Sequence, residues 1–363
     1  MKDSISTANI KNFNKNFKSN PTNKISRNAL TRSQIDNIAM DWDAYRMVDH
    51  TYSDVVSNEM KKVTNQKASG RCWGFAGLNL MRISLAEKYN LADFEFSQNY
   101  FMFFDKLEKS NYFLENILKT LDESYDSRLM MHLLDSPVQD GGQWDMFVNL
   151  IEKYGVVPQS VMAESFQSSQ SRMMNQFLTR KLREFAWTLR SMNDKGKKLS
   201  DLRKEKENMM SIVYTMLCIC LGDPPTNFDW QTRDKKNKFI RKTNLTPQDF
   251  YKKHCNINLK DKVCLIHAPM SNKKMNELYT VSYLGNVVGG QIIKYANVEL
   301  DEIKKSAIKS IKNNESVWFG CDVGKMFHRQ LGLMDMDLYD YEALFGTQFK
   351  MNKSTRLEYG DSQ

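Results

Sequence analysis

The sequence predicts an α+β fold, and three observations support this class. Patterns typical of helices dominate from residue 72 to about residue 221. Short strand patterns follow in "NFDWQTR" and "KFIRKT", and again at residues 317–321. The chain has 363 residues, of which 41% are hydrophobic, so it is long enough for a large core and two or three lobes. Helices early and strands late are typical of α+β proteins.

The helical part divides into four predicted segments. Residues 72–86 are apolar on nearly every face, which predicts a helix that is buried all round. Residues 94–121 form a long helical pattern with aromatic clusters. Residues 135–155 read as a turn-rich loop and then a helix that ends at Gly155. Residues 165–221 are helical and charged, and "GDPP" ends them.

The remaining segments carry weaker patterns. "TPQDFYKKH" predicts a helix with Thr246 as its N-cap and Pro247 at its first position. Residues 300–324 predict an amphipathic helix and then a buried strand at residues 317–321. Residues 1–32 are polar and are predicted to be loosely structured, and no internal repeat is present.

Composition narrows the class of protein and its location. The net charge of +9 lies mainly in two runs, "KGKKLSDLRKEK" and "RDKKNKFIRK", which match no nucleic-acid motif. A solvated basic surface is the simplest interpretation, and weak nucleic-acid binding is kept as an alternative. The sequence contains no transmembrane span and no secretory h-region, and its six cysteines are scattered. We therefore expect a cytoplasmic protein with reduced thiols and no membrane partner.

The segment "NQKASGRCWGFAGLNLMR" raises the main chemical question. A thiol becomes a good nucleophile as the thiolate, which a helix N-terminus favours. Ser69, Gly70 and Arg71 lead into the predicted helix at Cys72, and Arg71 adds a positive charge. Trp73 is expected to pack beside the thiol and shield it from water. A lone cysteine in an apolar helix is more often a small buried hydrophobe, so composition alone favours a structural role.

Gln66 lies six residues before the cysteine. Its amide can donate to a developing oxyanion together with the backbone N–H of Cys72. The spacing Q-x5-C-W, with a glycine before the cysteine, favours the catalytic interpretation over the structural one.

These residues closely resemble the active-site segment of the bleomycin hydrolase and aminopeptidase C family, the papain-like cysteine aminopeptidases. Further segments resemble the family in the same order: "FEFSQNYFMFFDKLEKSNYFLE", "DGGQWDMFVNLIEKYGVVP", "CICLGDPP", "LYTVSYLGNVVGG", "VWFGCDVGK" and "LGLMDMDLYDYEALFG". The resemblance covers about residues 55–363. Gly74 departs from it, because the family usually has a larger apolar residue there, and glycine in a helix costs about 1 kcal/mol relative to alanine.

The resemblance implies roles for individual residues. Cys72 is the nucleophile and Gln66 the oxyanion donor, and Trp73 lies beside the substrate. Gly141 and Gly142 of "DGGQW" form the wall that pairs with the substrate backbone, although two glycines also suit a tight turn. The expected reaction is hydrolysis of amino-terminal peptide bonds through a thioester, with no metal or organic cofactor.

The resemblance also implies a domain organisation. The expected fold is papain-like, with an amino-terminal extension at residues 1–54 and a helical half at residues 55–165. A helical insertion covers residues 166–260, and the start of the β half covers residues 261–363. In this family such insertions build arms of a hexameric barrel, so a homo-hexamer is the expected assembly of the full-length form.

The base that should activate Cys72 is not found in the sequence. In the family a histidine follows in a T-H-A-M segment just after a stretch resembling "RLEYGDSQ", and an asparagine orients it. We therefore expect a fragment with an incomplete carboxyl-terminal barrel half, which has little or no peptidase activity alone. The histidines present are not expected to replace the base; they are His50, His132, His254, His267 and His328. "IHAPM" only imitates the motif.

Two other interpretations remain open. The chain can be a short, catalytically inactive relative that acts as a subunit or binding protein. It can also be a nucleic-acid-binding protein, an interpretation that rests on charge alone.

Two other motifs do not predict a metal site. Cys218 and Cys220 lack a partner pair at zinc spacing and are expected to be buried helix thiols. "DMDLYDYE" lacks the calcium-loop spacing and is expected to be a solvated loop.

Overall fold

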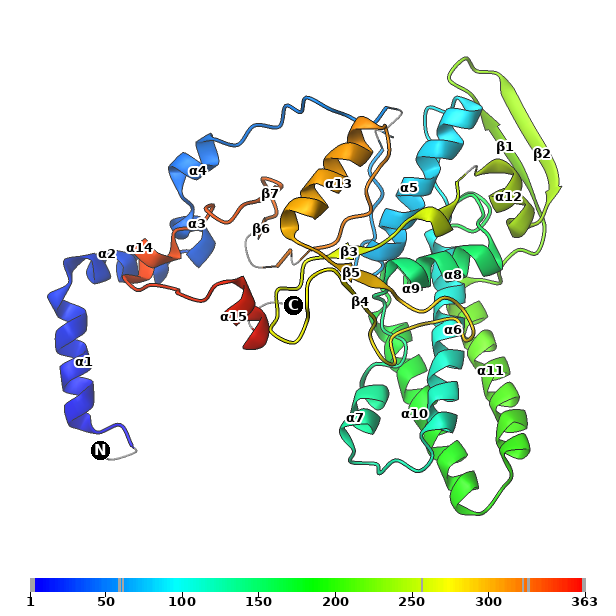
Figure 1. Ribbon diagram of the computed structural model, residues 1–363, viewed down its shortest axis with the longest axis horizontal. Coiled ribbons are helices and arrows are strands. Elements are labelled where there is room, and N and C mark those ends of the chain that lie inside the picture. Colours follow the sequence, from blue (N-terminus) through cyan, green and yellow to red (C-terminus); the bar gives the residue numbers. More distant parts are fainter. Residues whose placement is uncertain are drawn as a thin grey trace. The chain divides into compact units, whose positions relative to one another are not determined.

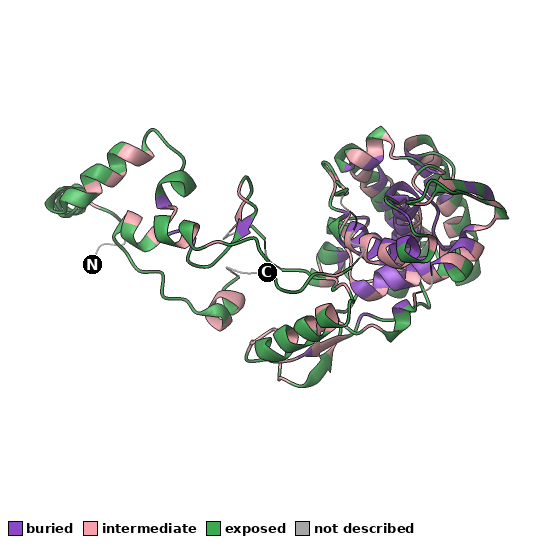
Figure 2. Cartoon of the chain, turned by 90° about the horizontal axis from the view of Figure 1, so that it is seen from above, coloured by how far each residue is buried: buried purple, intermediate pink, exposed green. Residues whose placement is uncertain are grey.

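The structure is a computed structural model that describes residues 4–57, 60, 62–255, 257–321, 323–324 and 327–360. The chain divides into two compact units. Unit 1 comprises Met1–Ser53, Pro269–Asn272 and Gly320–Gln363, and unit 2 comprises Asp54–Ala268 and Lys273–Phe319. Figure 1 labels the elements of both units. Most of the buried residues belong to unit 2, where they line the inner faces of its helices (Figure 2).

Unit 2 is built around helix α6 (Gln98–Lys119), which packs against four neighbouring helices (Figure 1). These neighbours are α5 (Cys72–Tyr89), α8 (Trp144–Tyr154), α10 (Arg172–Asp194) and α11 (Leu199–Leu221). The shorter helices are α7 (Arg128–Asp135), α9 (Phe166–Ser169), α12 (Pro247–His254), the 3-10 helix η1 (Leu259–Asp261) and α13 (Leu300–Lys312). The contacts around α6 form one continuous hydrophobic core.

The sheets of unit 2 are small. β1 (Phe228–Arg233) and β2 (Phe239–Leu245) form an antiparallel hairpin. A second sheet has the order β3–β5–β4, in which β3 (Leu265–Ile266) runs parallel to β5 (Tyr295–Asn297). β4 (Glu277–Tyr279) runs antiparallel to β5. Helices therefore dominate, and the strands after residue 221 confirm the expected order.

Several predicted elements are confirmed. α5 begins at Cys72 and buries side chains on most of its faces, as its apolar pattern requires. α6 begins after Ser97, whose hydroxyl accepts a hydrogen bond from the N–H of Tyr100 at 2.9 Å. α8 ends at Gly155, which has a positive φ of 70°. The hydroxyl of Thr246 caps α12 by accepting from the N–H of Asp249 at 3.0 Å.

Unit 1 is formed by segments from both ends of the chain. Its elements are α1 (Thr7–Ser19), α2 (Pro21–Leu30), α3 (Ile35–Ala39), α4 (Trp42–Arg46), β6 (Phe327–His328), β7 (Leu333–Met334), α14 (Tyr341–Phe345) and α15 (Lys353–Glu358). Its small core contains Ala39, Leu333, Leu338 and Tyr339. An isolated antiparallel bridge between Met40 and Tyr339 joins the two ends.

Two predictions were wrong. The described part of residues 1–32 is helical, because Ser6 forms a capping box for α1 and Asn20 caps α2 ahead of Pro21. Neither helix buries a residue, so the hydrophobic pattern gave no signal for them. Residues 317–321 are not a buried strand, since Val317 and Phe319 are exposed. The segment is anchored by a side chain instead: the indole of Trp318 donates to the carbonyl of Trp73 at 3.1 Å.

Candidate active site

Cys72 is the first residue of α5, as the sequence predicted, and its side chain is exposed. The preceding residue, Arg71, provides no side-chain cap. The first N–H groups of a helix have no partner within that helix. The thiol and N–H groups without a partner in the helix therefore lie at the same helix end, where such donors can bind an oxyanion.

Arg71 has a different role from the one its charge indicated. Its side chain is only 2% exposed, and its guanidinium donates to both carboxylate oxygens of Glu164, at 3.0 and 2.7 Å. Its Nε donates to the hydroxyl of Ser69 at 2.9 Å. Because Glu164 neutralises this charge locally, Arg71 anchors the chain just before Cys72 and is not a free cation beside the thiol.

Trp73 packs inward and connects α5 to the loop that contains the two glycines. Its indole N–H donates to the carbonyl of Asp140 at 2.6 Å, and its ring meets the edge of Phe101 at a centroid distance of 4.9 Å. The sequence led us to expect that Trp73 would shield the thiol, but Cys72 remains exposed. Trp73 instead fixes the start of α5 through its contacts with Asp140 and Phe101.

The structure brings Gly142 against Trp73. A Cβ atom at Gly142 would lie 2.6 Å from the Trp73 ring, which is too close for any side chain. A Cβ atom at Gly141 would meet nothing within 4 Å, so this residue faces open space. Neither glycine has a positive φ. The close approach to Trp73, and not a tight turn, explains the glycine at position 142.

Gln66 lies on the loop that leads to Cys72 and is partly buried. Its amide oxygen is buried and has no hydrogen-bond partner among the described residues. The loop is fixed by the hydroxyl of Ser69, which donates to the carbonyl of Gln66 at 2.7 Å, and by the N–H of Ala68, which donates to the carbonyl of Ser169 at 2.9 Å. No described hydrogen bond joins the Gln66 side chain to Cys72, so its role as oxyanion donor stays a prediction.

Gly74, the departure from the family pattern, has a packing reason. A Cβ atom at this position would lie 2.4 Å from the ring of Phe101. Phe101 is itself buried in the core between α5 and α6. The glycine therefore allows α5 and the aromatic side chains of α6 to approach closely.

A network of buried charges lies beside residues 138–142, which contain Gly141 and Gly142 and are called the glycine loop below. This network was not predicted from the sequence. It contains Asp105, Lys106 and Lys109 of α6 together with Asp140. Burial, with the nearby charge of Lys109, lowers the pKa of Lys106 to about 8, against the opposing effect of Asp140 and Asp105. Burial acts to raise the pKa of Asp140, but the charge of Lys106 and the N–H of Gly70 hold it well below its usual range.

The sequence held a signal for this network. Asp105, Lys106 and Lys109 interrupt the aromatic run "NYFMFFDKLEK", and Asp140 directly precedes the two glycines. Charged residues inside an apolar helix are rarely buried unless they are paired. Such residues therefore mark a buried ion pair whenever the whole helix is expected to be buried.

Two described histidines of unit 2, His254 and His132, give no evidence of a base. His254 is bonded through Nδ1 to the hydroxyl of Tyr89 at 2.5 Å and packs against Phe250. Burial, followed by nearby lysine charges, lowers its pKa. His132 is exposed on α7. The expectation that the base is not one of these residues stays a prediction.

The described residues hold no group of three or more ligating side chains that would suit a metal ion, and none of their helices is long and apolar enough to cross a bilayer. The six cysteines, all described, form no disulfide. Cys218 and Cys220 on α11 are partly buried, and Cys255 is fully buried.

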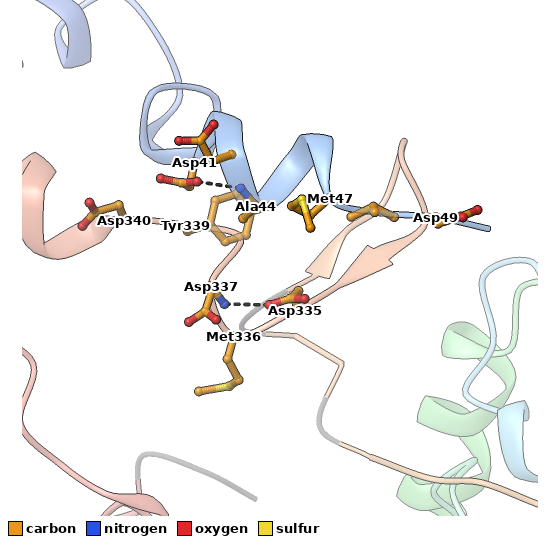
Figure 3. Close-up of a pocket in the computed structure, with 11 residues that line it drawn as sticks. Asp41, Ala44, Met47, Asp49, Asp335, Met336, Asp337, Tyr339 and Asp340 are labelled. Carbon is orange, nitrogen blue, oxygen red and sulfur yellow. Dashed lines mark hydrogen bonds between the residues drawn. The ribbon is translucent and has the colours of Figure 1, made fainter. Parts of the chain in front are cut away.

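A cavity of about 760 Å³ lies in unit 1 and is lined by acidic residues (Figure 3). None of the predicted site residues lines it. Its carboxylates stabilise the local backbone, since Asp41 accepts a hydrogen bond from the N–H of Ala44 at 2.7 Å and Asp335 accepts one from the N–H of Asp337 at 2.8 Å. Asp340 caps α14 in the same way. The acidic residues of "DMDLYDYE" are exposed as expected, while Leu338 and Tyr339 within it are buried.

A thiol at the start of a buried helix, with a glycine loop packed on the adjacent tryptophan, is the arrangement of a papain-like cysteine peptidase. Residues 4–363 match the Peptidase C1-like family, and the chain belongs to that family. It has a papain-like peptidase fold that is mostly helical with some sheet.

Relatives extend over almost the whole chain. It is 43% identical to the bleomycin hydrolase of Mus musculus over 95% of this chain and 77% of that protein. It is 43% identical to the aminopeptidase C of Listeria monocytogenes over 100% of this chain and 81% of that protein. The crystal structure of PepW from Lactobacillus rhamnosis HN001 superposes with a TM-score of 0.97 at 43% identity and covers 100% of this chain and 81% of its own. The resemblance found in the sequence is thereby confirmed.

Proposed function

We propose that the protein is a cysteine aminopeptidase of the bleomycin hydrolase type, with Cys72 as its nucleophile. The observation that carries this proposal is the exposed thiol at the first position of α5. The names of the relatives support the reaction class. Gly141 supports a substrate position beside the thiol, because the space next to it is open.

The proposed reaction has two steps. The thiolate of Cys72 attacks the carbonyl carbon of the first residue of a peptide, while the N–H of Cys72 and the amide of Gln66 donate to the oxyanion. The C–N bond then breaks, the amine leaves with a proton, and a thioester remains on Cys72. Water hydrolyses this thioester and restores the thiol. We propose that the proton donor is a histidine other than the five in this sequence.

We also propose that the active form is a homo-hexamer. The α10–α11 hairpin supports an assembly role, because large apolar side chains on it are exposed to solvent. Phe177 is 54% exposed, Trp187 64% and Ile219 79%. Contiguous exposed apolar surface often marks a protein interface, and these three side chains are the candidates on this helix pair. Light scattering of the protein at micromolar concentration would report a mass near six times 42.4 kDa if this proposal holds, and near one times if it fails.

The function is tested with two leucine derivatives that differ in their leaving group. Leucine p-nitrophenyl ester releases a phenolate that needs no protonation, whereas leucyl-methylcoumarin amide releases an amine that does. We expect ester cleavage that is lost in Cys72→Ala and strongly reduced with the N-acetylated ester. Amide cleavage is expected to be much slower than ester cleavage if the proton donor is absent.

Three results would contradict parts of this proposal. Ester cleavage that survives in Cys72→Ala would exclude Cys72 as the nucleophile. Equal cleavage of the acetylated ester would exclude an aminopeptidase. Binding of leucyl peptides without any acylation of Cys72 would favour the inactive subunit or binding protein.

A further inference from the structure

Side chains from two helices donate hydrogen bonds to successive backbone carbonyls of the glycine loop. Every carbonyl from residue 138 to residue 141 accepts a hydrogen bond from a buried side chain of α6 or from Trp73. The donors are Lys106 to Val138 at 2.5 Å, Lys109 to Gln139 at 2.8 Å, Trp73 to Asp140 at 2.6 Å and Lys109 to Gly141 at 2.7 Å. Four successive bonds of this kind leave the loop little freedom to move relative to α6.

The side chain of Asp140 ties the same loop to the segment before Cys72. Its carboxylate accepts from the N–H of Gly70 at 2.9 Å. It also accepts from Lys106 at 2.6 Å, from the hydroxyl of Ser171 at 2.5 Å and from the amide of Asn175 at 2.7 Å. Asp140 thus contacts Cys72's segment on both sides, through Gly70 ahead of it and through Trp73 behind it.

We call the four charged residues that hold the loop the clamp: Asp105, Lys106, Lys109 and Asp140. Their side chains are at most 11% exposed. The side chain of Lys106 is fully buried, and those of Lys109 and Asp105 are 5% and 3% exposed. Two lysines face two aspartates, so the group is neutral as a whole. Buried ion pairs add little net stability compared with apolar residues of similar size, so stability alone does not explain four charged residues at this place.

We propose that Asp140 and Lys109 are positioning residues that fix the wall at Gly141 and Gly142 relative to the thiol of Cys72. Neither residue touches the reacting atoms. The proposal rests on the proposed function, because a fixed distance between wall and thiol matters only if a peptide backbone lies along the wall. Displacing a bound substrate by about 1 Å can slow a reaction about 100-fold.

The variants are chosen so that the fold survives. Asp140→Asn keeps the shape of the side chain but removes its charge. Its NH2 end cannot accept, so it loses the bonds at one of the two oxygen positions, either those from Gly70 and Ser171 or those from Lys106 and Asn175. The double variant Asp105→Asn with Lys109→Met removes both partners of one buried pair at once, which avoids a lone buried charge. Ser171→Ala removes a single donor to Asp140 and serves as the mildest perturbation.

Glu115→Gln is the matched control. Glu115 is a buried carboxylate on the same helix, α6, and it pairs with Arg203 at 2.9 Å and with Lys206. Both partners lie on α11, and none of its bonds reaches residues 138–142. This variant weakens a partly buried ion pair on the same helix, in which the Glu115 side chain is 9% exposed, without touching the clamp.

The readout compares two reagents that alkylate the same sulfur. Leucyl chloromethyl ketone must lie along the wall before its C–Cl bond breaks and the S–C bond forms, with chloride leaving. Iodoacetamide needs only an accessible thiol. The measured quantity is the ratio of the two second-order rate constants at Cys72, determined by peptide mass spectrometry on folded protein.

We expect the ratio to fall about 10- to 100-fold in Asp140→Asn and in the double variant, and less in Ser171→Ala. It should stay within about 2-fold of the wild type in Glu115→Gln. An unchanged ratio in the folded clamp variants would overturn the proposal, and so would an equal fall in Glu115→Gln, which would indicate general loosening. If wild-type Cys72 shows no preference for the leucyl reagent, that result contradicts the proposed function. The positioning role, which depends on that function, then falls with it.

Discussion

Replacing Gly142 by alanine is expected to lower the free energy of unfolding by about 1–3 kcal/mol. The new Cβ atom would lie 2.6 Å from two atoms of the Trp73 ring. Carbon atoms in ordinary contact are about 3.5–4.0 Å apart, so the overlap is about 1 Å. The ring cannot easily move, because its N–H is bonded to the carbonyl of Asp140 at 2.6 Å and Phe101 packs against it.

Gly141→Ala is the matched control for this prediction. A Cβ atom there meets nothing within 4 Å, and the backbone does not have a positive φ. Alanine also reduces the freedom of the unfolded chain, which stabilises a compatible site by about 0.4–1 kcal/mol. The variant should therefore be as stable as the wild type or slightly more stable.

Urea unfolding followed by tryptophan fluorescence measures both variants against the wild type. Equal destabilisation of Gly141→Ala and Gly142→Ala would contradict this explanation, because it would mean that backbone freedom and not the space beside Trp73 requires the glycines. The rate at which leucyl chloromethyl ketone labels Cys72 gives a second test of Gly141→Ala. Gly141→Ala places a methyl group on the open face of the wall, so it should slow labelling by leucyl chloromethyl ketone while stability is kept.

Three further predictions follow from buried groups. Gly74→Ala should destabilise the protein by about 1–3 kcal/mol in urea unfolding, although alanine gains about 1 kcal/mol in helix propensity, because its Cβ atom would overlap the Phe101 ring; adding Phe101→Leu should restore part of the loss. The depressed pKa of Asp140 contributes stability that is present above the ordinary aspartate pKa of about 3.9 and is lost as the pH falls below it, so acid unfolding should be less steep in Asp140→Asn, and an unchanged slope would contradict this. Cys255 is buried and its thiol pKa is raised, so iodoacetamide at pH 7.5 should modify Cys72 in the native protein and Cys255 only after unfolding, as peptide mapping can show.

Elements with a strong local signal were predicted well from the sequence. The helix from Cys72 follows from a run that is apolar on nearly every face, and the helix after Thr246 follows from its capping residues; both signals act over a few residues. Residues 317–321 have the composition of a strand, but a strand needs a neighbour to pair with, and a single-sequence pattern does not contain one. The side chain of Trp318 holds this segment instead.

The candidate site was predicted in part. Cys72 lies at a helix start, as its sequence context predicted, whereas the close approach of Gly142 to Trp73 was not predicted. The role of Arg71 differs, because its partner Glu164 lies 93 residues away in the sequence. The clamp was missed for the same reason: Lys109 and the loop it holds are about 30 residues apart, and their contact depends on how α6 packs.

Whether Cys72 is the nucleophile is decided by locating the acyl group during reaction with leucine p-nitrophenyl ester. The mixture is quenched in acid within milliseconds to seconds and mapped by mass spectrometry. We expect a leucyl thioester on Cys72 that hydroxylamine removes, with little on Cys321, the other exposed cysteine. Equal acylation of Cys72 and Cys321, or none on either, would contradict the claim that α5 presents Cys72 as a nucleophile.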